Sequence, residues 1–244
     1  MTARLGEFDL VVVRENTEGF YADRNIESGN SELLITPDVV VSLRRITRHC
    51  CERIARSAFE LAMTRRKRVT IVHKANVLKR GDGMFIEMCH AVAREFPEVA
   101  VDDVIVDAMM AHVVRAPQRF DVIVTTNMFG DILSDLTAEL SGSLGLGGSL
   151  NAGKDYAMGQ AAHGSAPDIA GKDLANPVSQ ILSAAMLLNW YGQKRGDPRF
   201  LEAAAAIESA IADTIAAHEC TADVGGKLGT RAAGEAFLRR LAAR

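Results

Sequence analysis

Two aspartates stand four positions apart in the stretch TTNMFGDILSD, directly after the apolar run FDVIV. On a helix, the spacing of Asp131 and Asp135 places both carboxylates on one face, with their Cβ atoms about 5–6 Å apart, where they repel each other unless a cation lies between them. A third carboxylate, Asp107, ends the stretch DDVIVD. Carboxylates without cysteine or histidine favour Mg2+ or Mn2+ over zinc. The structural alternative is that Asp131 and Asp135 only cap and solvate a helix.

Three further reactive side chains stand out, and two of them follow apolar runs. Lys74 lies just beyond VTIV, where desolvation can let an amine act as a base, although a lone lysine at a strand end is also typical of a solvated surface. Arg14 follows LVVV and can hold a carboxylate bidentately, and Tyr21 can pass a proton. The structural alternatives are an ion pair of Arg14 with Glu15 or Glu18, and a tyrosine that belongs to the core.

Two glycine-rich stretches resemble phosphate sites only superficially. The segment GSLNAGKD has Asp155 where a phosphate loop carries a hydroxyl, and it follows a helical pattern rather than a strand. The glycines from Gly142 to Gly148 lack the strand, turn and helix of a dinucleotide fingerprint. Both stretches are predicted to be loops. The later segment HGSAPDIAGKDLANP, residues 163–177, combines a His-Gly turn with an Asn-Pro helix start and indicates a ligand-binding loop.

Alternating strands and helices must position these groups. Between the first two predicted strands, apolar spacing predicts one long helix from Pro37 to about Leu61, with Thr36 as its N-cap. Open α/β sheets bind ligands at the carboxyl edge of their strands, which is where the candidate side chains fall. The strands are predicted from β-branched runs that begin at Phe8, Arg68, Val99 and Phe120.

After Leu140 the sequence becomes rich in glycine and alanine, which predicts a change of domain. The remainder is predicted to be mainly helical, with helices at 177–191, at 199–217 and from Thr230 to the end of the chain. Because few strands are apparent there, the sheet that these helices cover is expected to lie outside this chain.

The composition is that of an ordinary globular protein, with 48% hydrophobic and 24% charged residues and a net charge of −3. This balance gives no reason to expect nucleic acid or a membrane as partner. Four cysteines without metal-like spacing, and no export signal among the charged first residues, indicate reduced thiols in the cytoplasm. An arginine stripe without interleaved aromatics is predicted to be a solvated or subunit-facing surface; its members are Arg44, Arg45, Arg48, Arg53 and Arg56.

Five motifs resemble, in family order, those of the β-decarboxylating dehydrogenases, the isocitrate and isopropylmalate dehydrogenase family. They are RENTEGFY, HKANVLK, VDAMMAHVV, TTNMFGDILSD and HGSAPDIAGKDLANP, supported by TADVGG near the end. The resemblance implies an α/β, isopropylmalate-dehydrogenase-like fold of two domains: a small domain at 1–141, and at 142–244 the C-terminal part of a large, NAD-binding domain. It also implies oxidative decarboxylation of a malate-type 2-hydroxy acid with NAD as hydride acceptor.

The resemblance further implies roles for the reactive side chains. Asp107, Asp131 and Asp135 would ligate Mg2+ or Mn2+, which chelates the substrate. Arg14 would grip a substrate carboxylate. Lys74 would act as base for the C2 hydroxyl.

Tyr21 would protonate the carbon left by CO2 loss, and Asn76 would lie near the nicotinamide. The residues that would line the adenine and phosphate side are His163, Gly164, Ser165, Ala166 and Asn176. Asp168 and Ile169 would face the adenosine ribose, where an aspartate accepts hydrogen bonds from a 2′-hydroxyl and repels a 2′-phosphate, so NAD is expected rather than NADP.

In the family, Lys74 and Asp107 face the partner's site across a homodimer interface, and an arm at about 21–35 would clasp the second subunit. The family's N-terminal segment is missing from the resemblance, and Gln160 stands where many members have Glu and Pro. The motif RENTEGFY is more similar to the isocitrate, homoisocitrate and tartrate branches than to the isopropylmalate branch. The alternative to an enzyme is a non-catalytic regulatory-type subunit or an inactive fragment.

Overall fold

The computed structural model describes residues 7–21 and 31–244. The chain forms two compact units, the first reaching Leu136 and the second running from Thr137 to Arg244. The boundary falls inside one helix, α4 (Asn127–Leu140). The expected domain boundary at 141/142 lies just after the end of this helix.

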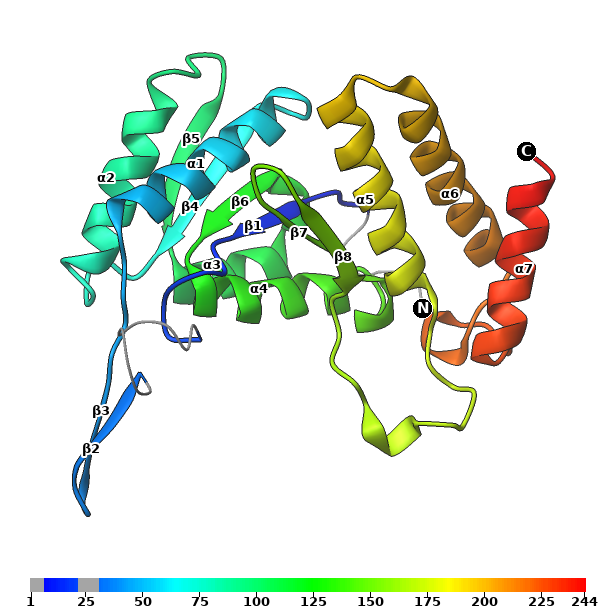
Figure 1. The fold of residues 1–244 in the computed structure, drawn as a ribbon, viewed down its shortest axis with the longest axis horizontal. Coiled ribbons are helices and arrows are strands. Elements are labelled where there is room, and N and C mark those ends of the chain that lie inside the picture. The colour runs from blue at the N-terminus through cyan, green and yellow to red at the C-terminus, as the bar shows by residue number, and fades with distance from the viewer. Residues whose placement is uncertain (1–6, 22–30) are drawn as a thin grey trace. The chain divides into compact units, whose positions relative to one another are not determined.

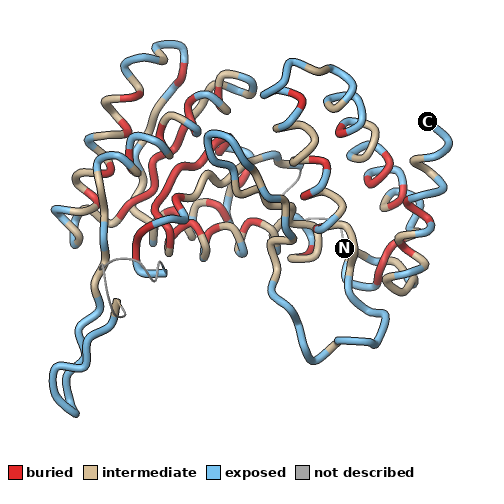
Figure 2. The backbone as a smooth tube through the Cα atoms, viewed as in Figure 1, coloured by how far each residue is buried: buried red, intermediate tan, exposed pale blue. Residues whose placement is uncertain are grey.

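The first unit is built on a four-stranded parallel sheet with the order β1-β6-β4-β5 (Figure 1). The runs predicted from β-branched residues supply all of its strands, so these predictions are confirmed. Strands β4 and β6 are almost entirely buried, as Figure 2 shows, which suits the valine-rich runs of a parallel sheet covered on both faces. The strands are β1 (Val11–Arg14), β4 (Arg68–His73), β5 (Ala100–Ile105) and β6 (Val122–Thr125).

Helices cover this sheet. Helices α1 (Arg48–Met63) and α2 (Gly81–Ala93) pack together over the core, where the ring of Phe59 stacks on Phe96 at 5.6 Å between centroids. Helix α3 (Val106–Arg115) and the start of α4 lie on the opposite side of the sheet in Figure 1.

The long helix predicted from Pro37 is wrong in its first part. Residues 32–42 form an antiparallel hairpin of β2 (Glu32–Thr36) and β3 (Val39–Ser42), and helix α1 begins only at Arg48. Pro37 sits in the turn, where Thr36 Oγ1 accepts a hydrogen bond from the backbone N–H of Asp38 at 3.3 Å. A β-branched run after such a turn favours a strand, and short apolar runs do not distinguish helix from strand by their spacing. The actual cap of α1 is Thr47, which accepts from the N–H of Cys50 at 3.3 Å.

The second unit confirms the three predicted helices, with small shifts at their ends. They are α5 (Val178–Arg195), α6 (Pro198–Ala216) and α7 (Thr230–Ala242). The stretch predicted to be a loop instead forms a hairpin of β7 (Gly148–Ala152) and β8 (Ala157–Ala161). Its glycines allow close packing: a Cβ on Gly159 would lie 2.6 Å from the carbonyl oxygen of Ser183 in α5. Glycine here marks the approach of another backbone rather than a turn.

The arginine stripe is engaged in ion pairs within the chain. Three of its members pair with glutamates and one with a buried aspartate: Arg48 with Glu87, Arg53 with Glu15, Arg56 with Glu95 and Arg44 with Asp82. The four cysteines are free thiols. Within the described ranges, no helix has the length and apolarity needed to cross a bilayer.

Candidate active site

Arg14 ends strand β1 and reaches across to helix α4. Its Nε and Nη2 donate to Oδ1 of Asn127 at 3.1 and 2.7 Å, and its Nη1 donates to Oδ1 of Asp131 at 2.5 Å. The guanidinium carbon lies 5.9 Å from the ring centre of Tyr21, whose side chain is half exposed. The tyrosine is therefore not a core residue, and that structural alternative is wrong. Asn127 was not anticipated from the sequence, although a polar Thr-Thr-Asn directly after a buried strand is a signal for it.

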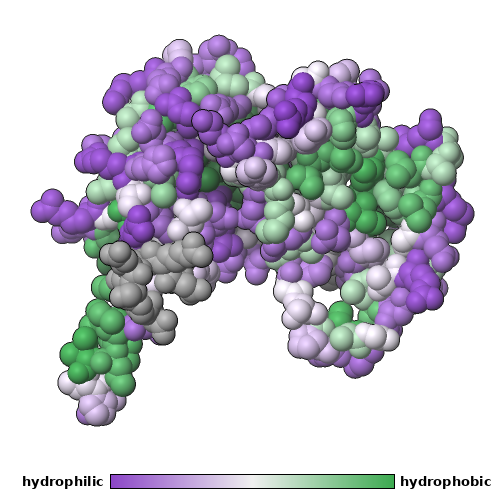
Figure 3. Space-filling view, viewed as in Figure 1, coloured by the Kyte–Doolittle hydropathy of each residue, from purple (hydrophilic) through white to green (hydrophobic). Residues whose placement is uncertain are grey.

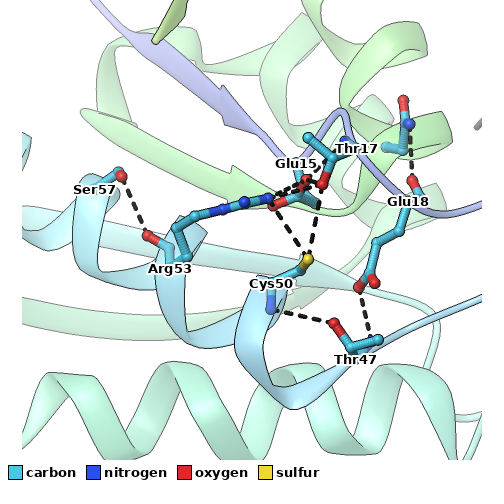
Figure 4. Close-up of polar contacts among 8 residues, drawn as sticks. Glu15, Thr17, Glu18, Thr47, Cys50, Arg53 and Ser57 are labelled. Atoms are coloured by element: carbon cyan, nitrogen blue, oxygen red, sulfur yellow. Dashed lines mark hydrogen bonds and ion pairs between the residues drawn. The ribbon is translucent and has the colours of Figure 1, made fainter. Parts of the chain in front are cut away.

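The alternative ion pair of Arg14 with Glu15 or Glu18 is also wrong, because both glutamates are buried against other partners. Glu15 accepts from Nη2 of Arg53 at 2.8 and 2.9 Å, and Glu18 accepts from the backbone N–H of Thr47 at 2.8 Å (Figure 4). The hydrogen bond from Arg53 to Glu15 raises the pKa of the guanidinium. These contacts fasten the segment between Arg14 and Tyr21 to the start of α1.

Asp131 and Asp135 lie on helix α4 as the spacing predicts. Burial, followed by the negative charge of Asp131, raises the pKa of Asp135, while Arg14 opposes the shift. The pair thus brings together two carboxylates, whose hard oxygen donors fit a divalent cation such as Mg2+ or Mn2+, and Arg14 offsets part of their negative charge.

Lys74 and Asp107 form a second polar pair, at the carboxyl ends of neighbouring strands β4 and β5. The ammonium group of Lys74 donates to Oδ1 of Asp107, and this hydrogen bond lowers the pKa of the carboxyl. Asp107 is the more exposed partner, with 68% of its side chain accessible. Lys74 is therefore a paired lysine that faces solvent together with an acid, rather than a lone surface lysine.

The contacts around Arg14 and the pair of Lys74 with Asp107 lie apart from each other within one copy of the chain. Strands β1 and β5 are the opposite edges of the four-stranded sheet, so three inter-strand spacings, roughly 14 Å, separate the ends that carry Arg14 and Asp107. Among residues 7–21 and 31–244, no three His, Cys, Asp or Glu side chains come together as ligands for a metal. The three predicted metal ligands are therefore divided between the Arg14 group (Arg14, Asn127, Asp131 and Asp135) and the Lys74 pair (Lys74 and Asp107).

The predicted nucleotide residues of the second unit lie in an exposed loop before α5. Asp168 and Ile169 form a short 3-10 turn, and Ala166 before it has a left-handed backbone with φ of 42°. The ring of His163 lies 2.8 Å from the carbonyl oxygen of Gly164, and Ser165 is exposed. In the first unit, Asn76 is likewise exposed, two residues beyond Lys74.

Asn176 has a structural role that the sequence did not predict. Its Oδ1 accepts from the N–H of Val178 at the start of α5, and its Nδ2 donates to Asp223 at 2.9 Å. Asp223 also accepts from Ser143 and Thr221, each at 2.5 Å. Although partial burial opposes it, these hydrogen bonds hold the pKa of Asp223 below its usual value.

An open parallel sheet with an arginine, a lysine and aspartates at the carboxyl ends of its strands defines an α/β protein, and this edge is where open α/β sheets bind their ligands. The sequence model of the isocitrate/isopropylmalate dehydrogenase family matches residues 2–237, and the chain belongs to this family. The predicted family and α/β fold class are thereby confirmed.

Individual relatives agree with this assignment. The chain is 47% identical over 223 residues to a 3-isopropylmalate dehydrogenase of Archaeoglobus fulgidus, covering 91% of this chain and 64% of that protein. It is 46% identical over 234 residues to an isocitrate/homoisocitrate dehydrogenase of Thermus thermophilus, covering 96% and 66%. The crystal structure of an isocitrate dehydrogenase from Methylococcus capsulatus matches with a TM-score of 0.88 and 43% identity, over 98% of this chain and 69% of that one. The chain thus spans about two thirds of the length of these relatives.

Proposed function

We propose that the chain works in a metal-dependent, NAD-linked dehydrogenase that oxidatively decarboxylates a malate-type 2-hydroxy acid. The observation that carries this proposal is the placement of the Arg14 group and the Lys74 pair at one carboxyl edge of the sheet. The relatives named as 3-isopropylmalate, homoisocitrate and isocitrate dehydrogenases support the class of substrate.

Each group of the site has a task in this reaction. Arg14 holds a substrate carboxylate, which replaces part of its contact with Asp131. In its neutral amine form Lys74 would accept the proton of the C2 hydroxyl, directly or through water, and the nicotinamide would supply the hydride acceptor. Tyr21 returns a proton to the carbon that CO2 leaves. Asp131, Asp135 and Asp107 would hold Mg2+ or Mn2+, which would supply Lewis-acid stabilisation of the negative charge on the substrate oxygen.

A complete site on this scheme needs two copies of the chain, because Asp107 follows β5 at the far edge of the sheet from Arg14, and Lys74, at the end of the neighbouring β4, is paired with Asp107. A homodimer with shared sites satisfies this requirement. The β2–β3 hairpin supports it as a contact arm: Figure 3 shows it as an apolar projection, and its large side chains are exposed, with Leu34 at 71% and Val40 at 58%. Contiguous exposed apolar surface of this kind marks an interaction site. The part of the expected arm at 22–30 lies outside the described residues.

For the cofactor we infer NAD, bound by the exposed loop of the second unit. The carboxylate of Asp168 would accept from a ribose 2′-hydroxyl and repel a 2′-phosphate. Ile169 would face the adenosine ribose beside Asp168, and Asn76 would lie near the nicotinamide. The residues that would line the adenine and phosphate side are His163, Gly164, Ser165, Ala166 and Asn176. Free, mostly buried thiols fit a reducing cytoplasm.

The alternative is a non-catalytic, regulatory-type subunit or a fragment that binds metal or nucleotide without turnover. Retention of Lys74, Tyr21 and the three aspartates favours the enzyme, since a regulator needs no base and no proton donor.

The test is NADH formation by the purified chain with Mn2+ and, in turn, isocitrate, 3-isopropylmalate, malate and tartrate. Turnover on one acid that disappears with a chelator and in the Lys74→Met variant would support the enzyme and identify its substrate. No turnover on any of the four acids would instead support the alternative of a regulatory-type subunit or an inactive fragment.

A further inference from the structure

The carboxylate of Asp82 is fully buried at the start of α2 and has a different partner for each oxygen. Its Oδ1 accepts from Nη1 of Arg44 at 2.6 Å, and its Oδ2 accepts from the backbone N–H of Lys74 at 2.6 Å. Neither the motifs nor the catalytic roles above assign any task to Asp82. A buried charge is costly unless it is paired and hydrogen-bonded, and here both conditions are met.

Lys74 needs this acceptor because of where its strand ends. Strand β4 pairs with β5 up to His73, so the N–H of the next residue has left the sheet. A buried or half-buried N–H without an acceptor costs free energy. The side chain of Asp82 therefore accepts the hydrogen bond from the N–H of Lys74, as a neighbouring strand does for the preceding residues of β4.

The turn between the two residues is closed from both sides. The carbonyl oxygen of Lys74 accepts from the N–H groups of Val77 at 3.0 Å and Leu78 at 2.8 Å, and the N–H of Asp82 donates to the carbonyl of Leu78 at 3.0 Å. The backbone of Lys74 is thus held at its N–H and at its carbonyl. The Cα atom from which the long side chain extends to Asp107 is therefore fixed in position.

Arg44 in turn fixes Asp82. Its Nη2 donates to Oγ1 of Thr126 at 3.0 Å, and its guanidinium carbon lies 5.7 Å from the rings of both Phe20 and Phe129. A buried ion pair gains little over apolar side chains of the same size, so stability alone does not account for it. The ion pair is explained by the hydrogen bond that Asp82 accepts from the backbone of Lys74.

We propose that Asp82 is a positioning residue, which holds the base Lys74 in register at the end of β4, with Arg44 orienting the carboxylate of Asp82. The catalytic part of this inference rests on the proposed function. The structural part, that Asp82 fixes the Lys74 backbone, does not depend on it.

Two double variants isolate the acceptor from the charge. Arg44→Met/Asp82→Asn and Arg44→Met/Asp82→Leu both remove the ion pair and leave no unpaired buried charge. They have side chains of similar size at position 82, but only the asparagine carbonyl can accept from the N–H of Lys74. Glu87→Gln is the control on the same helix, because Glu87 pairs with Arg48 in an exposed contact.

Amide hydrogen exchange at Lys74, followed by NMR, gives the first readout. We expect exchange in the leucine-containing variant to be about tenfold faster than in the asparagine-containing variant, since the N–H loses its acceptor. The second readout is the kinetics of the form of the chain that turns over. We expect kcat to be about tenfold lower in the leucine-containing variant, while KM for the hydroxy acid, which Arg14 sets, stays within about threefold. Glu87→Gln should match the wild type in both.

Equal exchange rates at Lys74 in the two double variants would overturn the proposal, and so would equal kcat values in a pair that turns over. If the wild-type chain shows no turnover, the proposed function fails and the exchange rates alone decide the role of Asp82. If either variant does not fold, the wild type still decides: a Lys74 amide that exchanges as fast as an exposed amide would refute the bond to Asp82.

Discussion

Gly130 lies directly beneath the side chain of Arg14. A Cβ built on this glycine would stand 2.5 Å from Cγ of Arg14 and 2.7 Å from its Cβ, closer than real contacts allow. Glycine within a helix such as α4 costs about 1 kcal/mol relative to alanine. The bare backbone there lets Arg14 cross the helix and reach Asn127 and Asp131.

We expect Gly130→Ala to displace Arg14 and raise KM for the hydroxy acid at least about tenfold, since a hydrogen bond to a charged group contributes about 1.5–3 kcal/mol. The matched control is Gly234→Ala in α7, where a Cβ would meet nothing within 4 Å. The control should leave KM unchanged and raise the free energy of unfolding by about 0.5–1 kcal/mol. An unchanged KM in Gly130→Ala would show that Arg14 does not bind the substrate.

Asp131→Asn should abolish metal-dependent turnover and leave the fold intact, because the amide keeps the size of the side chain but loses the charge that a divalent ion needs. Calorimetric titration with Mn2+ should show binding weakened by at least about tenfold. Asp155→Asn is the control, since Asp155 is an exposed residue paired with Lys194 at 3.5 Å. Normal activity in Asp131→Asn would rule out the metal site.

The exposed carboxylate of Asp168 predicts that NAD is preferred over NADP. Asp168→Ser removes the charge that repels a 2′-phosphate, so the ratio of kcat/KM for NAD to kcat/KM for NADP should fall by at least about tenfold. Glu202→Gln, at an exposed position of α6, should leave this ratio unchanged. Equal use of both cofactors by the wild type would contradict the assignment of Asp168.

The hairpin residues Leu34 and Val40 are direct cross-strand partners, and both are exposed. If the hairpin is the dimer arm, Leu34→Glu/Val40→Glu should give a monomer in sedimentation and remove turnover, because charges buried in an interface are costly. Leu238→Glu tests a leucine of similar exposure, 59%, on α7, and should change neither property. Full activity of a monomeric double variant would show that one copy completes the site.

Asp223 should stabilise the second unit in a pH-dependent way. Its pKa is lower in the folded chain than in the unfolded chain, where it is about 3.9. Its contribution is therefore fully present above about pH 4 and is lost as the pH falls through the folded value. Urea unfolding should show Asp223→Asn less stable than the wild type by about 1 kcal/mol at neutral pH, with the difference shrinking below pH 4. A difference that grows in acid would contradict this.

The strands and the reactive side chains at their ends could be predicted from sequence because both depend on local patterns. Valine-rich runs define β1, β4, β5 and β6, and the polar residue after each run must lie at a sheet edge. The hairpin at Glu32–Ser42 was missed because a turn at Pro37 and a helix start at Pro37 share the same local signal.

The contacts that assemble the site were less accessible to sequence analysis. The pairing of Lys74 with Asp107 depends on β4 and β5 being neighbours, and strand order is set by packing of the whole unit. Asp82 contacts the backbone N–H of Lys74, and Gly130 leaves room for Arg14 because it has no side chain. Neither role can be recognised from the type of residue in the sequence. The polar run Thr-Thr-Asn at the start of α4 could be seen in the sequence, but the hydrogen bonds from Arg14 to Asn127 could not be predicted from it.

Arg14 lies at the end of the edge strand β1 and Lys74 at the end of β4, two strands away, and this separation has a genetic consequence. If sites are shared between two copies, a gene copy defective at Arg14 and another defective at Lys74 would restore function when expressed together, because each mixed dimer contains one site with both residues intact. Two copies defective at the same residue would not complement each other. Defects in the Arg14 group and defects in the Lys74 pair would then sort into two complementation groups within a single gene.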